Sequence, residues 1–137
     1  GFFNVGDQCF KLFTDSRRSW DSAKAKCQAE GLQLAVPTDP VLLGRHIVDN
    51  IDDGNYAWLG ARGDNTALKW ERYGTRIISG PSDGFYGLFH PGDYPGPDVT
   101  TSHCLMLLSQ AYNLNWLPQH PFHSSSCSNK YYTLCEA

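Results

Sequence analysis

The sequence lacks several features that would point to particular classes of function. Only 18% of its 137 residues are charged, and a net charge of −3 offers no basic surface for nucleic acid. No apolar run approaches the roughly 20 residues that span a bilayer, and no Asn-X-Ser/Thr sequon occurs. Nucleophile-elbow, His-Glu-X-X-His and phosphate-loop motifs are also absent. The sequence therefore does not predict an enzyme.

Cysteine is the residue type that says most about the cellular compartment. The chain has five cysteines, and the nearest two are eight residues apart, so no Cys-X-X-Cys metal motif exists. Five cysteines in a short chain favour disulfides, an oxidising compartment and therefore a secreted, extracellular protein. The chain begins at Gly1 without a signal peptide, so we expect a mature product from which the signal has been removed. The length predicts a single domain over residues 1–137.

Hydrophobic periodicity and capping signals predict an α+β fold. Two helices are expected early in the chain, one capped by Ser19 and stopped at Gly31, the other begun by Asp39 and Pro40. Strands are expected at 9–14, 32–36 (with alternate residues buried), 56–60, 68–71, 105–108 and 131–135. Residues 74–103 contain six glycines, four prolines and little periodicity. A long irregular stretch of this kind within a domain is usually functional.

Several independent motifs together resemble the C-type lectin-like domain family, most of all soluble single-domain lectins of marine invertebrates. The resemblance covers about residues 5–136. It is carried by Cys9-Phe10-Lys11-Leu12-Phe13, Ser19-Trp20…Ala23…Cys27, Trp58-Leu59-Gly60, Trp70, Pro95-Gly96-Pro97-Asp98, Cys104 and Cys127…Cys135. It implies two helices packed on antiparallel sheets with a long binding loop. It also implies disulfides Cys27–Cys135 and Cys104–Cys127. The remaining cysteine, Cys9, has no upstream partner, which favours an interchain disulfide and a dimer over a free thiol.

The calcium ligands that the resemblance implies are mostly missing. Calcium prefers six to eight oxygen ligands. Members of the family take them from a Glu-Pro-Asn or Gln-Pro-Asp triplet and from an Asn-Asp pair after a tryptophan. Here the triplet reads Gly96-Pro97-Asp98, and Trp116 is followed by Leu117 and Pro118. We therefore expect no cofactor and no metal, with a degenerate calcium site as the alternative.

The loop residues favour sugar recognition without metal. Asp98 can accept hydrogen bonds from two adjacent hydroxyls, and nearby rings can pack against the apolar face of a sugar or the methyl of an acetamido group. The alternative is that these aromatic residues simply pack the loops. The candidate carbohydrate-binding residues are Asp98, Tyr94, Pro97, His90, Asn115, His120 and His123.

Three functional hypotheses follow. The first is a secreted, calcium-independent lectin for N-acetylated amino sugars or related microbial glycans, with a role in innate immunity implied by the resemblance. The second is a protein-binding module that kept the fold and lost the sugar site, since fold alone does not separate these. The third is an ice- or mineral-interacting protein. A zinc site from His90, His103, His120 and His123 is a weaker interpretation than surface histidines.

Overall fold

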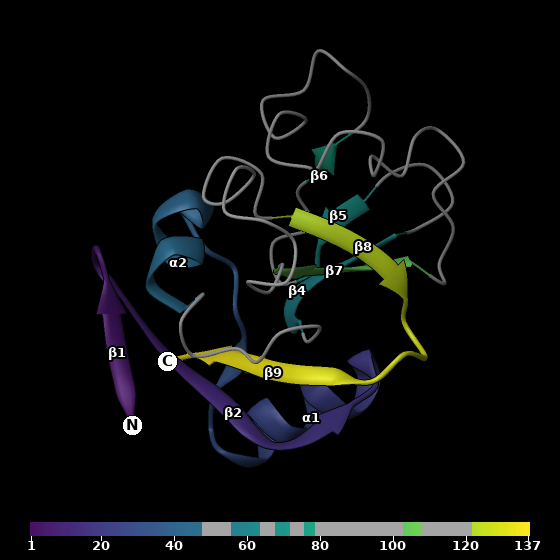
Figure 1. Cartoon of the computed structure of the whole chain (residues 1–137), viewed down its shortest axis with the longest axis horizontal. Helices are drawn as coiled ribbons and strands as arrows, with labels where there is room; N and C mark the ends of the chain where they lie inside the picture. Colours follow the sequence, from purple (N-terminus) through teal and green to yellow (C-terminus); the bar gives the residue numbers. More distant parts are fainter. Residues whose placement is uncertain (48–55, 64–67, 72–75, 79–102, 108–121) are drawn as a thin grey trace.

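The structure, a computed structural model, describes residues 1–47, 56–63, 68–71, 76–78, 103–107 and 122–137. Within these ranges the chain forms two helices and nine strands (Figure 1). In chain order they are β1 (Phe2–Val5), β2 (Gln8–Arg18), α1 (Trp20–Ala29), β3 (Gln33–Leu34), α2 (Pro40–Ile47), β4 (Ala57–Gly63), β5 (Leu68–Trp70), β6 (Arg76–Ile78), β7 (His103–Leu107), β8 (Phe122–Ser126) and β9 (Tyr131–Glu136). The α+β class predicted from the sequence is confirmed.

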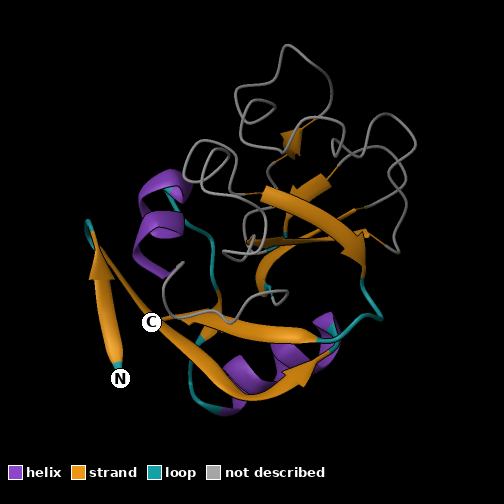
Figure 2. Cartoon of the chain, in the orientation of Figure 1, coloured by secondary structure: helices purple, strands orange, loops and turns teal. Residues whose placement is uncertain are grey.

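The strands are hydrogen-bonded in the order β1-β2-β9-β4-β5-β6, with β3 also on β9 and with β7 between β4 and β8. All of these pairs are antiparallel except β4 with β9, which is parallel. The described strands thus form mainly antiparallel sheets, as expected, with one parallel pair that the sequence did not predict. Strand direction depends on the path of the intervening chain, which local periodicity does not record. Figure 2 shows α1 beside β2 and β9, with α2 near β1.

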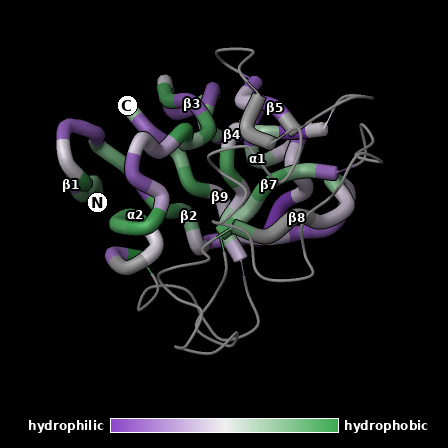
Figure 3. Tube along the Cα trace, turned by 90° about the horizontal axis from the view of Figure 1, so that it is seen from above, coloured by the Kyte–Doolittle hydropathy of each residue, from purple (hydrophilic) through white to green (hydrophobic). Residues whose placement is uncertain are grey.

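The core consists of two clusters of buried residues, and successive strand residues belong to different clusters. One cluster contains Trp20, Ala23 and Cys27 of α1 with Trp58 and others, and the second contains Leu43 and Ile47 of α2 with Leu59 and others. Side chains alternate between the two faces of a strand. A strand that is covered on both faces therefore has apolar residues at nearly every position. Figure 3 shows these hydrophobic stretches of β4, β7 and β9 in the interior.

Helix α1 begins and ends as its sequence signals predict. The Ser19 side chain accepts a hydrogen bond from the backbone N–H of Ser22, which caps the first turn. At the other end Gly31 has a φ of 74°, and the N–H of Leu32 donates to the Cys27 carbonyl at 2.8 Å. This left-handed residue followed by a returning N–H is a Schellman motif. It reverses the chain into β3.

Helix α2 is also capped as expected. The Asp39 carboxylate accepts a hydrogen bond of 3.0 Å from the N–H of Leu42, and Pro40 occupies the first turn. Leu43 and Ile47 are buried, as their spacing predicts. The same spacing in the sequence predicts that a buried apolar stripe continues from Leu43 and Ile47 to Ile51, with Val48 beside it. Val48 and Ile51 lie outside the described residues.

The predicted alternation over residues 32–36 is wrong. Leu34, Ala35 and Val36 are all buried, and regular strand pairing covers only the two residues of β3. The reason is that this segment runs between two other strands: the N–H of Ala35 donates to the Leu134 carbonyl, and the Ala35 carbonyl accepts from the N–H of Gly60 at 2.8 Å. With neighbours on both sides, none of these three residues faces solvent.

Three strands were not predicted. β1 pairs with β2 as a hairpin, β6 pairs with β5, and β8 pairs with β7. Residues 76–78 belong to the stretch expected to be irregular, and the run Ser124-Ser125-Ser126 has no strand-like composition. Pairing with a neighbouring strand overrides weak local propensity in these short segments.

A buried carboxylate joins the C-terminus to the chain before α2. Glu136 is 6% exposed, and its Oε1 accepts a 2.6 Å hydrogen bond from the N–H of Val36. Gln8 donates to Glu136 Oε2 at 3.1 Å and accepts from the N–H of Thr38 at 2.8 Å. A buried charge is tolerated because its oxygens are hydrogen-bonded. This network places the entry to α2 relative to β9.

Candidate functional site

The β7–β8 hairpin holds the attachment points of the two longest segments that lie outside the described residues. The two strands pair from His103 with Ser126 to Leu107 with Phe122. Residues 79–102 lead into His103, and residues 108–121 connect Leu107 to its cross-strand partner Phe122. Directly opposite residues have Cα atoms about 4.5–5.5 Å apart. Leu107 and Phe122, which flank residues 108–121, are therefore held next to each other by the sheet.

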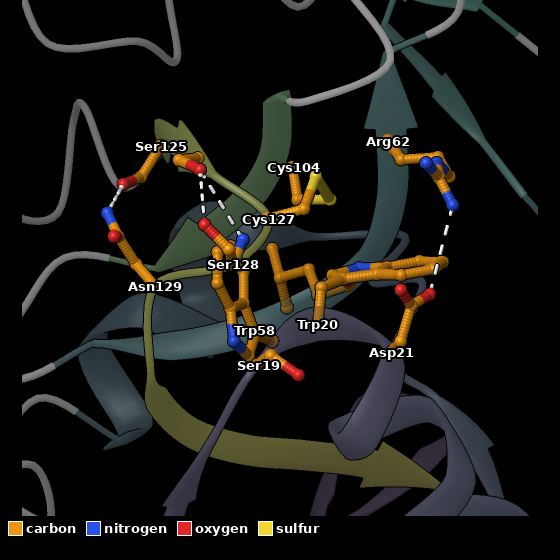
Figure 4. Close-up of a disulfide and its surroundings, with 12 residues drawn as sticks. Ser19, Trp20, Asp21, Trp58, Arg62, Cys104, Ser125, Cys127, Ser128 and Asn129 are labelled. Atoms are coloured by element: carbon orange, nitrogen blue, oxygen red, sulfur yellow. Dashed lines mark hydrogen bonds and ion pairs between the residues drawn. A yellow bond between two sulfur atoms is a disulfide. The ribbon is translucent and has the colours of Figure 1, made fainter.

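The Cys104–Cys127 disulfide joins the two arms of this hairpin, and a backbone hydrogen bond from Cys127 connects it to α1. Its two Cα atoms lie 5.1 Å apart, and Cys104 is completely buried. The backbone N–H of Trp20 donates to the Cys127 carbonyl at 3.0 Å. Figure 4 shows the disulfide beside the rings of Trp20 and Trp58. The second residue of β7 and the residue after β8 are thus covalently joined, and the first residue of α1 is hydrogen-bonded to the same point.

Trp58 lies beneath the hairpin and connects it to the end of β2. Its side chain is fully buried, and its indole N–H donates to the Arg18 carbonyl at 2.8 Å. The ring meets Tyr131 edge-to-face at 4.8 Å between centroids, an arrangement that stabilises aromatic pairs. The Arg18 guanidinium donates to Asp15 and holds the pKa of that exposed carboxyl below its ordinary value. Trp58 and Arg18 therefore determine where β4 crosses the end of β2.

Trp20 plays a similar part on the opposite side of the disulfide. Its indole N–H donates to the Leu59 carbonyl at 2.9 Å, and the Arg62 guanidinium lies 5.2 Å from its ring centroid. Arg62 also forms an ion pair of 3.9 Å with Asp21 (Figure 4). Asp21 is largely exposed, so this ion pair adds little stability. The cation over the ring and the indole hydrogen bond fix the orientation of Trp20.

Hydroxyl and amide groups organise the turn from β8 to β9. Asn129 Nδ2 lies 2.6 Å from Ser125 Oγ, and Ser125 Oγ lies 3.1 Å from the Tyr131 hydroxyl. Ser126 and Ser128 share a second hydroxyl contact of 2.9 Å (Figure 4). Neither partner of Ser125 is a general base of the kind that activates a serine nucleophile. The arrangement stabilises a turn and does not resemble a catalytic site.

Solved structures with the same arrangement of elements are known. A C-type lectin domain of murine dendritic cell inhibitory receptor 2, in complex with N-glycan, matches 99% of this chain and 94% of its own at 15% identity and a TM-score of 0.67. A calcium-independent type II antifreeze protein matches 100% and 91% at 18% identity and a TM-score of 0.69. SPL-1 in its GlcNAc complex matches 100% and 92% at 19% identity and a TM-score of 0.68. The chain has the C-type lectin-like fold. Comparisons with protein-family models and with curated proteins give no match.

Both disulfides implied by the resemblance are present in this C-type lectin-like fold. Cys27 is bonded to Cys135 across 108 residues, and Cys104 to Cys127 across 23. The first joins α1 to β9, and the second joins β7 to the residue after β8. Among the described residues, no helix is long and apolar enough to cross a membrane.

Most of the predicted carbohydrate-binding residues lie outside the described part of the C-type lectin-like fold. Only the backbone of His123 is described, in β8 opposite Met106. The other predicted residues fall within 79–102 or 108–121, and they are Asp98, Tyr94, Pro97, His90, Asn115 and His120. Asp98 precedes β7 by five residues, and His120 precedes β8 by two. Their roles therefore remain predictions.

Of the four histidines considered as a zinc site, only His103 of β7 and His123 of β8 lie among the described residues. His103 pairs with Ser126, whereas His123 pairs with Met106. Their backbone positions are three residue steps apart along the hairpin, on the order of 10 Å. The Nδ1 atom of His103 is buried and has no hydrogen-bond partner. Within the described ranges, no three His, Cys, Asp or Glu side chains gather into a group able to hold a metal ion.

Cys9 lies on the outermost hairpin of the fold and is not disulfide-bonded within the chain. It is half-buried and sits directly opposite Asn4 of β1, while Phe2 sits opposite Lys11. Cross-strand partners and every second residue share a face, so Cys9, Asn4, Lys11 and Phe2 lie on one face of the hairpin. Phe2 is 52% exposed and is one of two exposed large hydrophobic residues among those described.

Proposed function

We propose that this chain is a secreted carbohydrate-binding lectin, a single domain over residues 1–137, that recognises N-acetylated amino sugars or related microbial glycans without a calcium-bridged site. The observation that carries the proposal is a C-type lectin-like fold whose sequence has Leu117 and Pro118 after Trp116, where oxygen ligands would be needed. Among proteins with this fold, one was solved in complex with N-glycan, one with GlcNAc, and one is described as calcium-independent. These support a binding module rather than an enzyme. We further propose a role in innate immunity, as the resemblance to the family implies.

In the proposed mechanism Asp98 accepts hydrogen bonds from two adjacent sugar hydroxyls. Charge-assisted hydrogen bonds of this kind are stronger than neutral ones. Tyr94, Pro97 and the ring of His90 pack against the apolar face or an acetamido methyl. The segment between β7 and β8 adds Asn115 and His120, and His123 of β8 adds a further ring. The disulfide-linked β7–β8 hairpin provides the fixed base to which both segments attach.

A monosaccharide inhibition series with and without chelator tests this proposal. We expect binding to immobilised glycans to be inhibited by N-acetylglucosamine or N-acetylgalactosamine and to be unchanged in EDTA. The Asp98→Asn variant should bind about tenfold to a hundredfold more weakly, since one charge-assisted hydrogen bond contributes about 1.5–3 kcal/mol. Asp83→Asn, a carboxylate in the same segment, is the matched control and should bind normally.

Two results would contradict the proposal, and they differ. Loss of binding in EDTA would show that a degenerate calcium site carries the sugar. Absence of any glycan hit on an array, from protein that folds normally, would favour the protein-binding module instead. In that case neither the parent chain nor the Asp98→Asn variant would bind sugar.

We also propose that Cys9 joins two copies of the chain. The half-exposed thiol and the exposed Phe2 share one face of an edge hairpin, which suits contact with a second copy. We expect a band of twice the chain mass on a non-reducing gel, converted to the single-chain mass by reductant and absent from the Cys9→Ser variant. A dimer would bind multivalent glycans more tightly by linking two sites. A single-chain band without reductant would overturn the proposed dimer and leave the sugar site unaffected.

A further inference from the structure

A groove of about 440 Å³ lies on a part of the fold that the proposed mechanism does not use. It opens between α1, β4, Glu71 (the residue that follows β5) and residues 32–36. Residues 32–36, which include β3, are called the β3 segment below. Its volume is within the range of about 300–1,000 Å³ that is usual for small-molecule sites. The lining residues all come from described parts of the chain, so the chemistry of the groove can be argued from their contacts.

The groove follows from two features of the sequence. Trp20, Lys24 and Gln28 are four residues apart on α1, so they line the same side of the helix. Gly60 allows the β3 segment to approach β4 closely, because a Cβ atom at this position would lie 3.0 Å from the Leu34 carbonyl oxygen. The N–H of Gly60 donates to the Ala35 carbonyl across this close approach. Helix α1 and β4 thus form two walls, with the β3 segment between them.

The charges at the groove compensate each other. Lys24 and Glu71 form an ion pair across it, and their side chains are 39% and 34% exposed. An ammonium has three donors and a carboxylate can accept several hydrogen bonds, so this single contact leaves both groups with unused capacity. The Gln28 carboxamide, which can donate and accept, is exposed at the same rim. The rim therefore suits a neutral ligand that offers both donors and acceptors.

The floor of the groove is apolar. It is lined by Leu32, which is half-buried, and by Leu34 and Val36, which are each only 6% exposed. A purely apolar ligand would remove water from Lys24 and Glu71 without replacing its hydrogen bonds, which is unfavourable. A zwitterionic ligand would have to compete with the existing ion pair. A sugar ring meets both conditions, because its hydroxyls donate and accept while its C–H face is apolar.

We propose that this groove is a second saccharide-binding site, which takes a neutral, hydroxyl-rich pyranose unit of a glycan. The ring lies with its C–H face on Leu32, the half-buried apolar residue of the lining, and its hydroxyls bind Lys24, Glu71 and Gln28. The inference rests on the proposed function for its ligand class, but the groove shares no residue with the site around Asp98. Two sites on one chain can engage separate units of one glycan, which raises affinity without any new contact.

The test is an NMR titration of the full chain with the methyl glycosides of N-acetylglucosamine, galactose, glucose and mannose. We expect the backbone amides of Lys24, Gln28 and Glu71 to shift together with one of these sugars. The Gln28→Phe variant places a ring over the groove from an exposed helix position, and it should weaken binding at these amides about tenfold or more. Lys26→Met removes a neighbouring lysine, paired with Glu30 at 3.5 Å outside the groove, and should bind as the parent chain does.

The Asp98→Asn variant separates this inference from the proposed function. If the groove binds sugar, the groove amides shift with the same affinity in Asp98→Asn. If no sugar shifts these amides while Asp98-dependent binding persists, the second site is wrong and the proposed function stands. Equal affinity of the parent and Gln28→Phe chains at these amides would also overturn the groove site. Shifts at the groove without any Asp98-dependent binding would support the groove and contradict the proposed loop site.

Discussion

Replacing Cys27 and Cys135 together by alanine is expected to lower the free energy of unfolding by about 4–5 kcal/mol. The bridge spans 108 residues, so its loss frees most of the unfolded chain from a loop constraint. In the folded state it joins α1 to β9 within one of the two core clusters, and both cysteines are fully buried. Urea denaturation, followed by far-UV circular dichroism without reductant, measures the change.

The other cysteines supply the controls for this experiment. Replacing Cys104 and Cys127 by alanine removes a bridge across 23 residues, for which loop closure predicts a smaller loss of about 3 kcal/mol. Replacing Cys9 by alanine removes no bridge within the chain and, measured in the same way without reductant, should leave the free energy of unfolding of the single chain nearly unchanged. If loss of the long bridge costs less than loss of the short one, loop closure does not govern the contribution of these disulfides.

Replacing Trp58 by alanine is expected to lower the free energy of unfolding by about 3–5 kcal/mol. The side chain is fully buried and sits opposite Met106 on β7 and Thr133 on β9. Its removal leaves a large cavity between the hairpin and α1, and it leaves the Arg18 carbonyl without the indole donor at 2.8 Å. The same denaturation measurement records the loss.

Two variants divide this effect into its parts. Trp58→Phe keeps most of the ring volume but removes the N–H, so it should cost about 1–3 kcal/mol, as expected for a buried acceptor left unpaired. Phe2→Ala truncates an aromatic side chain that is 52% exposed and should change stability by less than about 0.5 kcal/mol. A Trp58→Ala loss no larger than that of Phe2→Ala would mean that Trp58 does not hold β4 to β7 and β9 as described.

Local signals in the sequence predicted the parts of the fold that depend on a few neighbouring residues. The Ser19 cap, the Gly31 stop and the Asp39 cap all involve contacts within one helical turn. Apolar runs identified β4, β7 and β9, because strands covered on both faces are hydrophobic throughout. The two disulfides were implied only by the resemblance to a known family. Cysteine spacing does not determine which cysteines pair.

The candidate sites differ in how far a sequence could predict them. The site around Asp98 was inferred from residue types at positions that the resemblance singles out, and it remains a proposal. The groove was not predicted at all. Lys24 and Glu71 are 47 residues apart in the sequence, and nothing near either residue indicates a site. Only the folded chain brings the two side chains together at one groove. The helical spacing of Trp20, Lys24 and Gln28 was the one signal available, and it indicates a shared side rather than a site.

Periodicity and capping over short distances were enough to predict the α+β class, both ends of α1, the start of α2 and the hydrophobic strands of the core. Contacts between distant segments account for the parallel pairing of β4 with β9, the burial of all of Leu34, Ala35 and Val36, and the burial of Glu136. These features arise where segments far apart in the chain cover one another. Their physical cause is the packing of neighbours that no local pattern records.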